Sequence, residues 1–331
     1  MPRLRKAFIR YLEGYRRTAV FAITSRCNCK CLMCDIHRKP PEEMELSDAK
    51  HILNSLAHNH FLIVYLTGGE PTLHPDVEEI VSYADQLGLV TAMSTNGTVS
   101  KTKLKRLRDS GLYLMSVSVD HWEPSVCEMI RNYPDIHQKQ IETINYLKEI
   151  GLRTYALAYL NPILVKDGVE KLAMYINEKL DVPIGFCYPT YCDSNTYRLG
   201  GREMSHRLLE LRHAAEKILE MKRNGSKIAN LHSYLEDVVS FPSRNPNFYC
   251  RGGEDVVYID WFGDVYPCFR KSQRLFNILK DIDLRFLRDI HCNECLINCF
   301  REPSLLPHIL TSANLFAKEL VHSFSTQSIY R

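Results

Sequence analysis

The amino-acid sequence predicts an α/β protein, a partial (β/α)6 barrel of the TIM-like kind followed by a small Cys-rich domain. Short apolar runs alternate with amphipathic stretches of helical length across residues 20–190. This alternation is typical of parallel strands joined by helical crossovers, and six units fall short of the eight in a closed barrel. Polar residues gather after the strands, where such barrels carry their chemistry. The twelve cysteines are unevenly spread, with four in residues 27–34 and five in residues 250–299.

Six strands are expected because each of six runs is apolar or β-branched and has the length of a strand. They are Val20–Thr24, Phe61–Leu66, Leu89–Ser94, Tyr113–Val119, Leu152–Tyr159 and Pro183–Tyr188. Helices are expected between most of them. Ser47 is a suitable N-cap for a helix over Asp48–Leu56. Pro75 suits the first turn of the next helix and Gly88 its C-terminal end.

The pattern divides the chain into five segments. They are a basic amphipathic N-terminal helix (residues 1–17), the barrel (18–200), a helical linker (201–245), the Cys-rich domain with a hairpin (246–302) and a C-terminal amphipathic helix (303–331). Both terminal helices carry apolar residues along one face. Packing on the barrel is the simpler interpretation, although two such helices leave a peripheral membrane contact open.

Composition sets limits on location and partners. Of the 331 residues, 45% are hydrophobic, which is ample for a large core. The net charge of +3 implies no strong bulk attraction to nucleic acid, and no apolar run reaches eighteen residues. The N-terminus lacks the apolar region of a signal peptide, so we expect a cytoplasmic protein. Clustered cysteines in a reducing compartment indicate metal ligation rather than disulfides.

The first cysteine group has a spacing suited to one small cluster. Cys27, Cys31 and Cys34 are separated by three and two residues. Three thiolates on a four-iron cluster leave one iron open to an outside ligand. A structural zinc ion also binds thiolates but needs a fourth ligand nearby. Cys29 lies inside the loop, and its role stays open.

This spacing after a first strand resembles the signature of the radical SAM superfamily. Three further motifs are similar to the parts of that family that contact S-adenosylmethionine (SAM): Thr67-Gly68-Gly69-Glu70-Pro71, Ser94-Thr95-Asn96-Gly97 and Ser116-Val117-Ser118-Val119-Asp120. The resemblance implies cofactor contacts at Met33, Gly68, Gly69, Glu70, Thr95, Asn96, Ser118 and Asp120. From the residues alone, the glycines expose backbone for close approach or form a simple turn. Glu70 holds that loop or accepts from an ammonium group.

The second cysteine group resembles the SPASM/Twitch extension of radical SAM enzymes. Twelve residues separate Cys250 from Gly263, and four more precede Cys268. A full SPASM domain has seven cysteines and two auxiliary clusters, whereas five cysteines here favour one auxiliary [4Fe–4S] cluster. The five candidates are Cys250, Cys268, Cys292, Cys295 and Cys299. The sequence does not decide whether Cys292 or Cys299 joins the other three, and a zinc ribbon from the same residues stays open.

The resemblance implies an enzyme that reductively cleaves SAM to a 5′-deoxyadenosyl radical, supplied with electrons by a reductant such as flavodoxin or ferredoxin. No catalytic residue is assigned beyond the cluster and SAM. Nineteen residues precede Val20, too few for a fused leader-binding domain, which slightly favours a small molecule or lipid as substrate. One alternative is a peptide-modifying maturase with a separate recognition protein. Another is a non-catalytic protein that holds zinc or iron–sulfur clusters for structure or electron transfer.

Overall fold

A nine-stranded sheet forms the centre of the computed structural model, which describes residues 8–188, 192–193, 198–199, 208–241, 249–280, 287 and 292–323. The strand order is β11-β10-β9-β1-β2-β3-β4-β5-β6. The strands are β1 Arg17–Ala22, β2 Phe61–Thr67, β3 Val90–Thr95, β4 Leu114–Ser118, β5 Arg153–Tyr159, β6 Ile184–Cys187, β9 Val256–Ile259, β10 Asp264–Tyr266 and β11 Phe276–Asn277. A separate two-stranded sheet pairs β7 Cys192–Asp193 with β8 Arg198–Leu199. Strands β1 to β6 are parallel, so the predicted partial barrel is confirmed.

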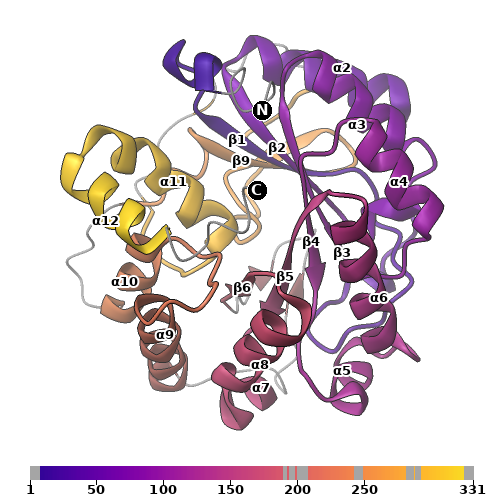
Figure 1. Ribbon diagram of the computed structural model, residues 1–331. Coiled ribbons are helices and arrows are strands. Elements are labelled where there is room, and N and C mark those ends of the chain that lie inside the picture. Colours follow the sequence, from indigo (N-terminus) through magenta and orange to yellow (C-terminus); the bar gives the residue numbers. More distant parts are fainter. Residues whose placement is uncertain are drawn as a thin grey trace.

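Helices cover the outside of this sheet and fill its open side. They are α2 Leu46–His58, α3 Val77–Gln86, α4 Lys101–Asp109, α5 Pro124–Arg131, α6 Ile136–Glu149, α7 Pro162–Asp167, α8 Val169–Met174, α9 Leu208–Arg223, α10 His232–Ser240, α11 Asn298–Thr311 and α12 Ala313–Ser323, with short 3-10 turns at Ile36–Arg38 and Pro71–Leu73 and a π-helix at Tyr175–Leu180. Figure 1 shows α2, α3, α4 and α6 outside the curve of the sheet, with α9 to α12 grouped at its other side.

Helix α2 begins one residue before the predicted cap. Ser47 lies in its first turn, and Glu45 is the N-cap residue. The chain is held in place up to Met44, whose N–H donates to the carbonyl of Ile23. The helix therefore starts directly after this backbone contact, and the prediction that Ser47 caps it is wrong.

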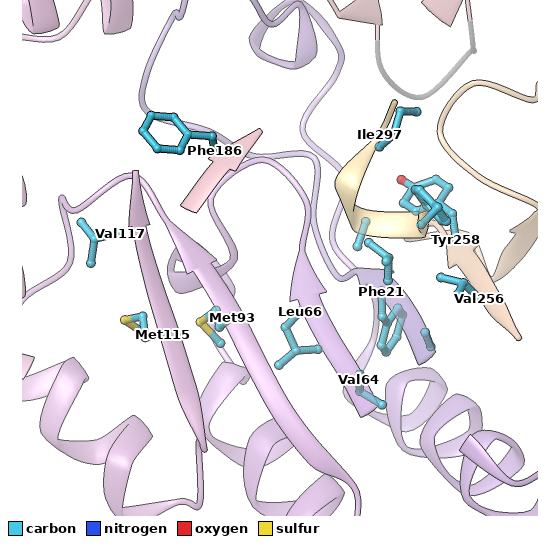
Figure 2. Packing of buried hydrophobic residues seen from close by; sticks show 14 of the residues in the cluster. Phe21, Val64, Leu66, Met93, Met115, Val117, Phe186, Val256, Tyr258 and Ile297 are labelled. Atoms are coloured by element: carbon cyan, nitrogen blue, oxygen red, sulfur yellow. The ribbon is translucent and has the colours of Figure 1, made fainter. Parts of the chain in front are cut away.

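Side-chain alternation along the strands separates the barrel wall from its interior. In β2, Val64 and Leu66 are fully buried, whereas Tyr65 between them is partly exposed. The buried set faces the helices, as Figure 2 shows for Val64, Leu66, Met93, Met115 and Val117. Because the side-chain period of a strand is two, the other set points to the opposite face. The interior of the barrel therefore receives half-exposed side chains and keeps space for ligands.

The Cys-rich segment joins the sheet of the barrel. Strand β9 pairs in parallel with β1, and β10 returns antiparallel beside β9, which confirms the predicted hairpin. An edge strand offers unpaired backbone groups, and β9 satisfies those of β1. Helix α11 packs beside β9 and against α10 and α12 (Figure 1). The two cysteine-bearing parts of the chain are therefore connected by one continuous sheet.

The two ends of the chain differ from expectation. Residues 8–12 are helical, and residues 1–7 of the predicted N-terminal helix lie outside the described residues. The prediction of one C-terminal helix over residues 303–331 is wrong. Helix α11 already begins at Asn298, and α12 restarts after Ser312, whose hydroxyl accepts from the N–H of Leu315. Residues 324–331 lie outside the described residues. Among the residues that the structure describes, no helix is long and apolar enough to cross a bilayer.

Candidate active site

A cavity lies at the carboxyl ends of the barrel strands. It encloses about 740 Å³ between the atoms, its open mouth included. Cys27, Cys31 and Cys34 line it. Six of the eight predicted cofactor contacts line it as well: Met33, Gly69, Glu70, Thr95, Asn96 and Ser118. Gly68 and Asp120 do not appear on its wall. Motifs far apart in the sequence thus meet at one site.

The glycine loop is positioned by the backbone just before the cysteines. The N–H of Gly69 donates to the carbonyl of Thr24 at 2.8 Å, and the N–H of Glu70 donates to that of Arg26 at 2.7 Å. A Cβ on Gly68 would stand 2.2 Å from the Thr24 oxygen, and one on Gly69 would stand 2.1 Å from the Arg26 oxygen. No side chain fits at these distances. Both glycines are therefore required by close approach of the two segments.

Glu70 holds this loop to the next strand. Its Oε1 accepts hydrogen bonds from the Thr72 and Thr95 hydroxyls at 2.6 and 2.9 Å, and its Oε2 accepts from the N–H of Asn96 at 2.6 Å. The Thr72 N–H adds a fourth bond at 3.2 Å. Burial raises the pKa of Glu70, while these bonds lower it in part. Of the two roles considered for Glu70, the structure shows the structural one.

The third-strand motif contacts the cysteine loop directly. Asn96 Nδ2 donates to Asn28 Oδ1 at 2.8 Å, and Asn28 Nδ2 donates to the Thr98 hydroxyl at 2.9 Å. The Asn96 side chain also accepts from the Thr98 hydroxyl at 2.7 Å. The three polar side chains form a link between the loop after β1 and the turn after β3. This link fixes the cysteine loop against the cavity wall.

A buried ion pair lies beneath the cysteines. Arg131, the last residue of α5, places Nε 2.5 Å from Asp120 Oδ2 and Nη1 3.8 Å from the Cys31 sulfur. Asp120 is fully buried, and its Oδ1 accepts from the N–H of Tyr159 at 2.9 Å. Asp120 therefore orients Arg131 and β5 rather than facing the cavity. Arg131 does line the cavity and brings a positive charge to Cys31.

Cysteine sulfur is a soft donor that binds iron as the thiolate, so the protonation of these thiols matters. Burial raises the pKa of Cys27 to about 12 and that of Cys34 to about 11. The hydrogen bond with Cys29 lowers the pKa of Cys31, and the Arg131 charge acts in the same direction. Within the described ranges, no three His, Cys, Asp or Glu side chains converge on a single ion. Ligands of a four-iron cluster bind separate irons, so they need not meet at one point. Sulfur donors on the wall of one cavity fit such a cluster.

Tyr159, Cys187 and Arg131 are among the cavity residues that were missed in the sequence. Tyr159 and Cys187 are the last residues of β5 and β6, and both line the cavity. The strand-end rule that selected Thr95 and Ser118 would also have found them. Arg131 carries no such signal, because its partners Asp120 and Cys31 are distant in the sequence and only the folded chain brings them together.

Four of the five C-terminal cysteines form a second group. The N–H of Cys250 donates to the carbonyl of Cys292 at 2.9 Å. Cys295 interacts electrostatically with Cys250 and Cys292, and Cys268 interacts with Cys250 and Cys295. Burial raises the pKa of Cys268 to about 12 and that of Cys295 to about 11. Four thiols from three separate segments therefore share one location.

Cys299 stands apart from this group. It lies in the first turn of α11 and lines a different cavity, together with Glu302. Its pKa is raised by burial and by the charge of Glu302, with no contribution from another cysteine. In the described structure, Cys292 thus lies beside Cys250, whereas Cys299 lines a different cavity.

A partial barrel with three thiols and a glycine loop around one cavity is suited to hold a metal cluster. Residues 21–176 match the radical SAM superfamily, so this part of the chain is a radical SAM domain. Enzymes of that superfamily use a [4Fe–4S] cluster and S-adenosylmethionine, and the C-terminal cysteines fit an auxiliary cluster.

Known proteins resemble the chain to different extents. It is 28% identical over 287 residues to a probable GTP 3′,8-cyclase of Sulfurisphaera tokodaii, covering 82% of this chain and 86% of that protein. It is 26% identical over 174 residues to a PqqA peptide cyclase of Bradyrhizobium diazoefficiens, which covers 51% of this chain but only 44% of the cyclase. The crystal structure of Streptococcus suis SuiB bound to precursor peptide SuiA has a TM-score of 0.66 at 17% identity, covering 86% of this chain and 69% of SuiB. That likeness concerns the fold.

Proposed function

We propose that Cys27, Cys31 and Cys34 hold the SAM-binding [4Fe–4S] cluster and that the cavity beside them holds SAM. The observation that carries this proposal is the meeting of the three thiols with Gly69, Glu70 and the third- and fourth-strand motifs at one cavity. When bound, the reduced cluster supplies the electron that cleaves SAM to methionine and a 5′-deoxyadenosyl radical. The chain supplies position and shields the site from water.

Each part of the site has a separate task in this proposal. The two glycines let the loop after β2 lie directly against the backbone of the cysteine loop, and Gly69 lies on the cavity wall where the methionine part of SAM would bind. Glu70 and Asn96 keep the loops after β2 and β3 in register with the cysteine loop. Arg131, held by Asp120, places positive charge beside a thiolate and near any carboxylate in the cavity. Met33 and Ser118 complete the wall.

The auxiliary cluster is assigned to Cys250, Cys268, Cys292 and Cys295. Their mutual interactions support this set, and four thiolates would saturate a [4Fe–4S] cluster. A saturated cluster has no free iron for substrate, so its task is electron transfer or support of the fold. Cys299 is not part of this ligand set and lies at the cavity inside the barrel.

The substrate class has three candidates. A small molecule is supported by the GTP 3′,8-cyclase relative, which aligns over most of both chains. A peptide is supported by the PqqA peptide cyclase relative and by the fold shared with SuiB, which was crystallised with a precursor peptide. A lipid stays a weaker third candidate, resting on the apolar terminal helices.

Anaerobic SAM cleavage tests the proposed cofactor site. Reconstituted protein is incubated with SAM and dithionite, and 5′-deoxyadenosine is measured. We expect formation by the wild type and none by the variant in which Cys27, Cys31 and Cys34 are all alanine. Cys127→Ala is the matched control, because Cys127 is a buried thiol that does not line the cavity. Equal cleavage by the triple variant would overturn the proposal.

A further inference from the structure

A second cavity lies deeper in the barrel, between β1, β2, β5 and α11. It encloses about 820 Å³, its open mouth included. The inward side chains of the strands give it an apolar and aromatic wall, with Val20, Ile63, Tyr65 and Tyr155 among them. Leu157 lines this cavity and also the one at the cysteine loop. The two spaces are therefore neighbours inside one barrel.

A small residue lies at the edge of the sheet, beside Tyr155 and Leu157 of the cavity wall. Gly185 in β6 pairs with Leu157, and a Cβ there would stand 3.1 Å from the Tyr155 ring and 3.3 Å from Leu157. Tyr65 and Tyr155 are hydrogen-bonded to each other, and the Tyr65 hydroxyl lies 2.7 Å from that of Ser116. The hydroxyl groups of the two tyrosines therefore hold the aromatic wall in place.

One carboxylate faces this apolar cavity. Glu302 on α11 lines it, and its Oε1 accepts hydrogen bonds from the N–H of Leu231 at 2.8 Å and from Asn230 Nδ2 at 3.3 Å. Among the residues that the structure describes, no cation lies within ion-pair distance of Glu302, and no hydrogen bond reaches its Oε2. A carboxylate in such surroundings is costly unless it meets a positive charge.

Residues of α11 also connect the two cavities. Cys187 lines the cavity at the cysteine loop, and its thiol is hydrogen-bonded by Asn298. Asn298 and Cys299 line the deeper cavity beside Glu302. A molecule held at Glu302 would thus extend toward the space proposed for SAM.

We propose that the deeper cavity, here the Glu302 cavity, is the substrate pocket and that Glu302 binds an alkylammonium group on the substrate. This inference rests on the proposed function of the neighbouring site. The aliphatic body of the substrate would lie against the apolar wall, and the ammonium group would donate charge-assisted hydrogen bonds to Oε2. The same chemistry is offered by a free alkylamine and by a lysine side chain in a peptide.

The charges around Glu302 agree with this assignment. Burial raises its pKa to about 7, the charge of Lys222 lowers the pKa and that of Glu319 raises it. The other titratable groups that interact with it are Cys187, Tyr188, Tyr234 and Cys299. A bound ammonium group favours the ionised carboxylate. Binding should therefore weaken as pH falls below about 7.

Binding of defined probes tests the Glu302 cavity. The cluster-loaded protein with SAM is titrated with n-pentylamine, n-pentanol and the peptide acetyl-Gly-Lys-Gly-amide, followed by calorimetry and thermal unfolding. We expect saturable pentylamine binding that Glu302→Gln weakens by roughly 10-fold to 100-fold, and little binding of pentanol. Glu216→Gln, at an exposed glutamate on α9, should bind like the wild type. Glu302→Asp should keep the preference for the amine over the alcohol.

The outcomes separate the two proposals. Equal pentylamine affinity in wild type and Glu302→Gln, or no preference over pentanol, would overturn the inference. Tighter binding of the peptide than of pentylamine would identify a lysine side chain as the source of the ammonium group, and the reverse would identify a free amine. Glu216→Gln should form 5′-deoxyadenosine without substrate as the wild type does, because Glu216 lines neither cavity. Pentylamine binding without any 5′-deoxyadenosine would overturn the proposed function of the cysteine loop instead.

Discussion

The two cysteine groups differ in how the chain assembles them. Cys27, Cys31 and Cys34 lie within eight consecutive residues and reach one cavity from a single loop. The C-terminal group collects Cys250, Cys268 and the pair Cys292 and Cys295 from three segments. The spacing of the cysteines along the chain is therefore enough to identify the first group. The members of the second group come together only through the pairing of β9 with β1 and the position at which α11 begins. A local motif can be identified from sequence, and a dispersed site needs the fold.

The largest expected effect is loss of a whole cluster from either group. Wild-type protein should hold about eight irons per chain, and removal of the thiols of one group should leave about four. Cys299→Ala should keep about eight, since Cys299 faces the Glu302 cavity. Iron analysis with Mössbauer or electron paramagnetic resonance spectroscopy measures this. Loss of four irons in Cys299→Ala would contradict the ligand set argued above.

The glycines of the two cavities should respond differently to a methyl group. In Gly69→Ala, the new Cβ would meet the Arg26 carbonyl at 2.1 Å, so the loops must separate. A displacement near 1 Å costs on the order of 100-fold in rate. Gly185→Ala meets the edge of the Tyr155 ring at 3.1 Å, which a small ring shift relieves. Substrate-free formation of 5′-deoxyadenosine should fall about 100-fold in the first variant and stay near wild type in the second. Equal rates in both would refute the contrast.

A buried ion pair lies near each of the two cysteine groups. The two pairs should contribute similarly to the free energy of unfolding, but only one of them should affect SAM cleavage. Asp120 pairs with Arg131 at 2.5 Å beneath the cysteine loop, and Asp237 pairs with Arg301 at 2.7 Å near the second group. Removal of one partner leaves a buried charge, so either Asp→Asn change should lower the free energy of unfolding by roughly 3–5 kcal/mol. Only Asp120→Asn should also slow SAM cleavage. Denaturant unfolding and product analysis measure both effects, and slowed cleavage in Asp237→Asn would argue against the distinction.

The smallest expected effect compares Glu70 and Glu302, the glutamates that line the two cavities. The pKa of Glu302 is raised to about 7, so its stability contribution is present below about pH 4.5 and is lost as pH rises through 7. Glu302→Gln should thus be more stable than wild type at pH 8, by about 1–3 kcal/mol, and the gain should vanish below about pH 5. Glu70→Gln should be less stable, because its amide cannot accept from the Asn96 N–H and the three other donors together. Thermal unfolding across pH measures both, and a stabilising Glu70→Gln would contradict this.

The sequence predicted more of the fold than of the site. All six barrel strands lie within three residues of their expected ranges, because apolar runs of strand length bounded by polar turns are a local signal. The motifs after β1, β2, β3 and β4 were predicted to meet because parallel strands end at one edge. The break at Ser312 between α11 and α12 was missed, since apolar residues continue at helical spacing on both sides of it.

By itself, the sequence determined the barrel and the three-cysteine loop. The tertiary structure alone decided that Asp120 holds Arg131, that Cys292 lies beside Cys250 while Cys299 lines another cavity, and that Glu302 faces an apolar cavity. The physical reason is the distance along the chain. Periodicity and ligand spacing act between near neighbours, whereas these contacts join residues that only closure of the sheet by β9 and α11 brings together.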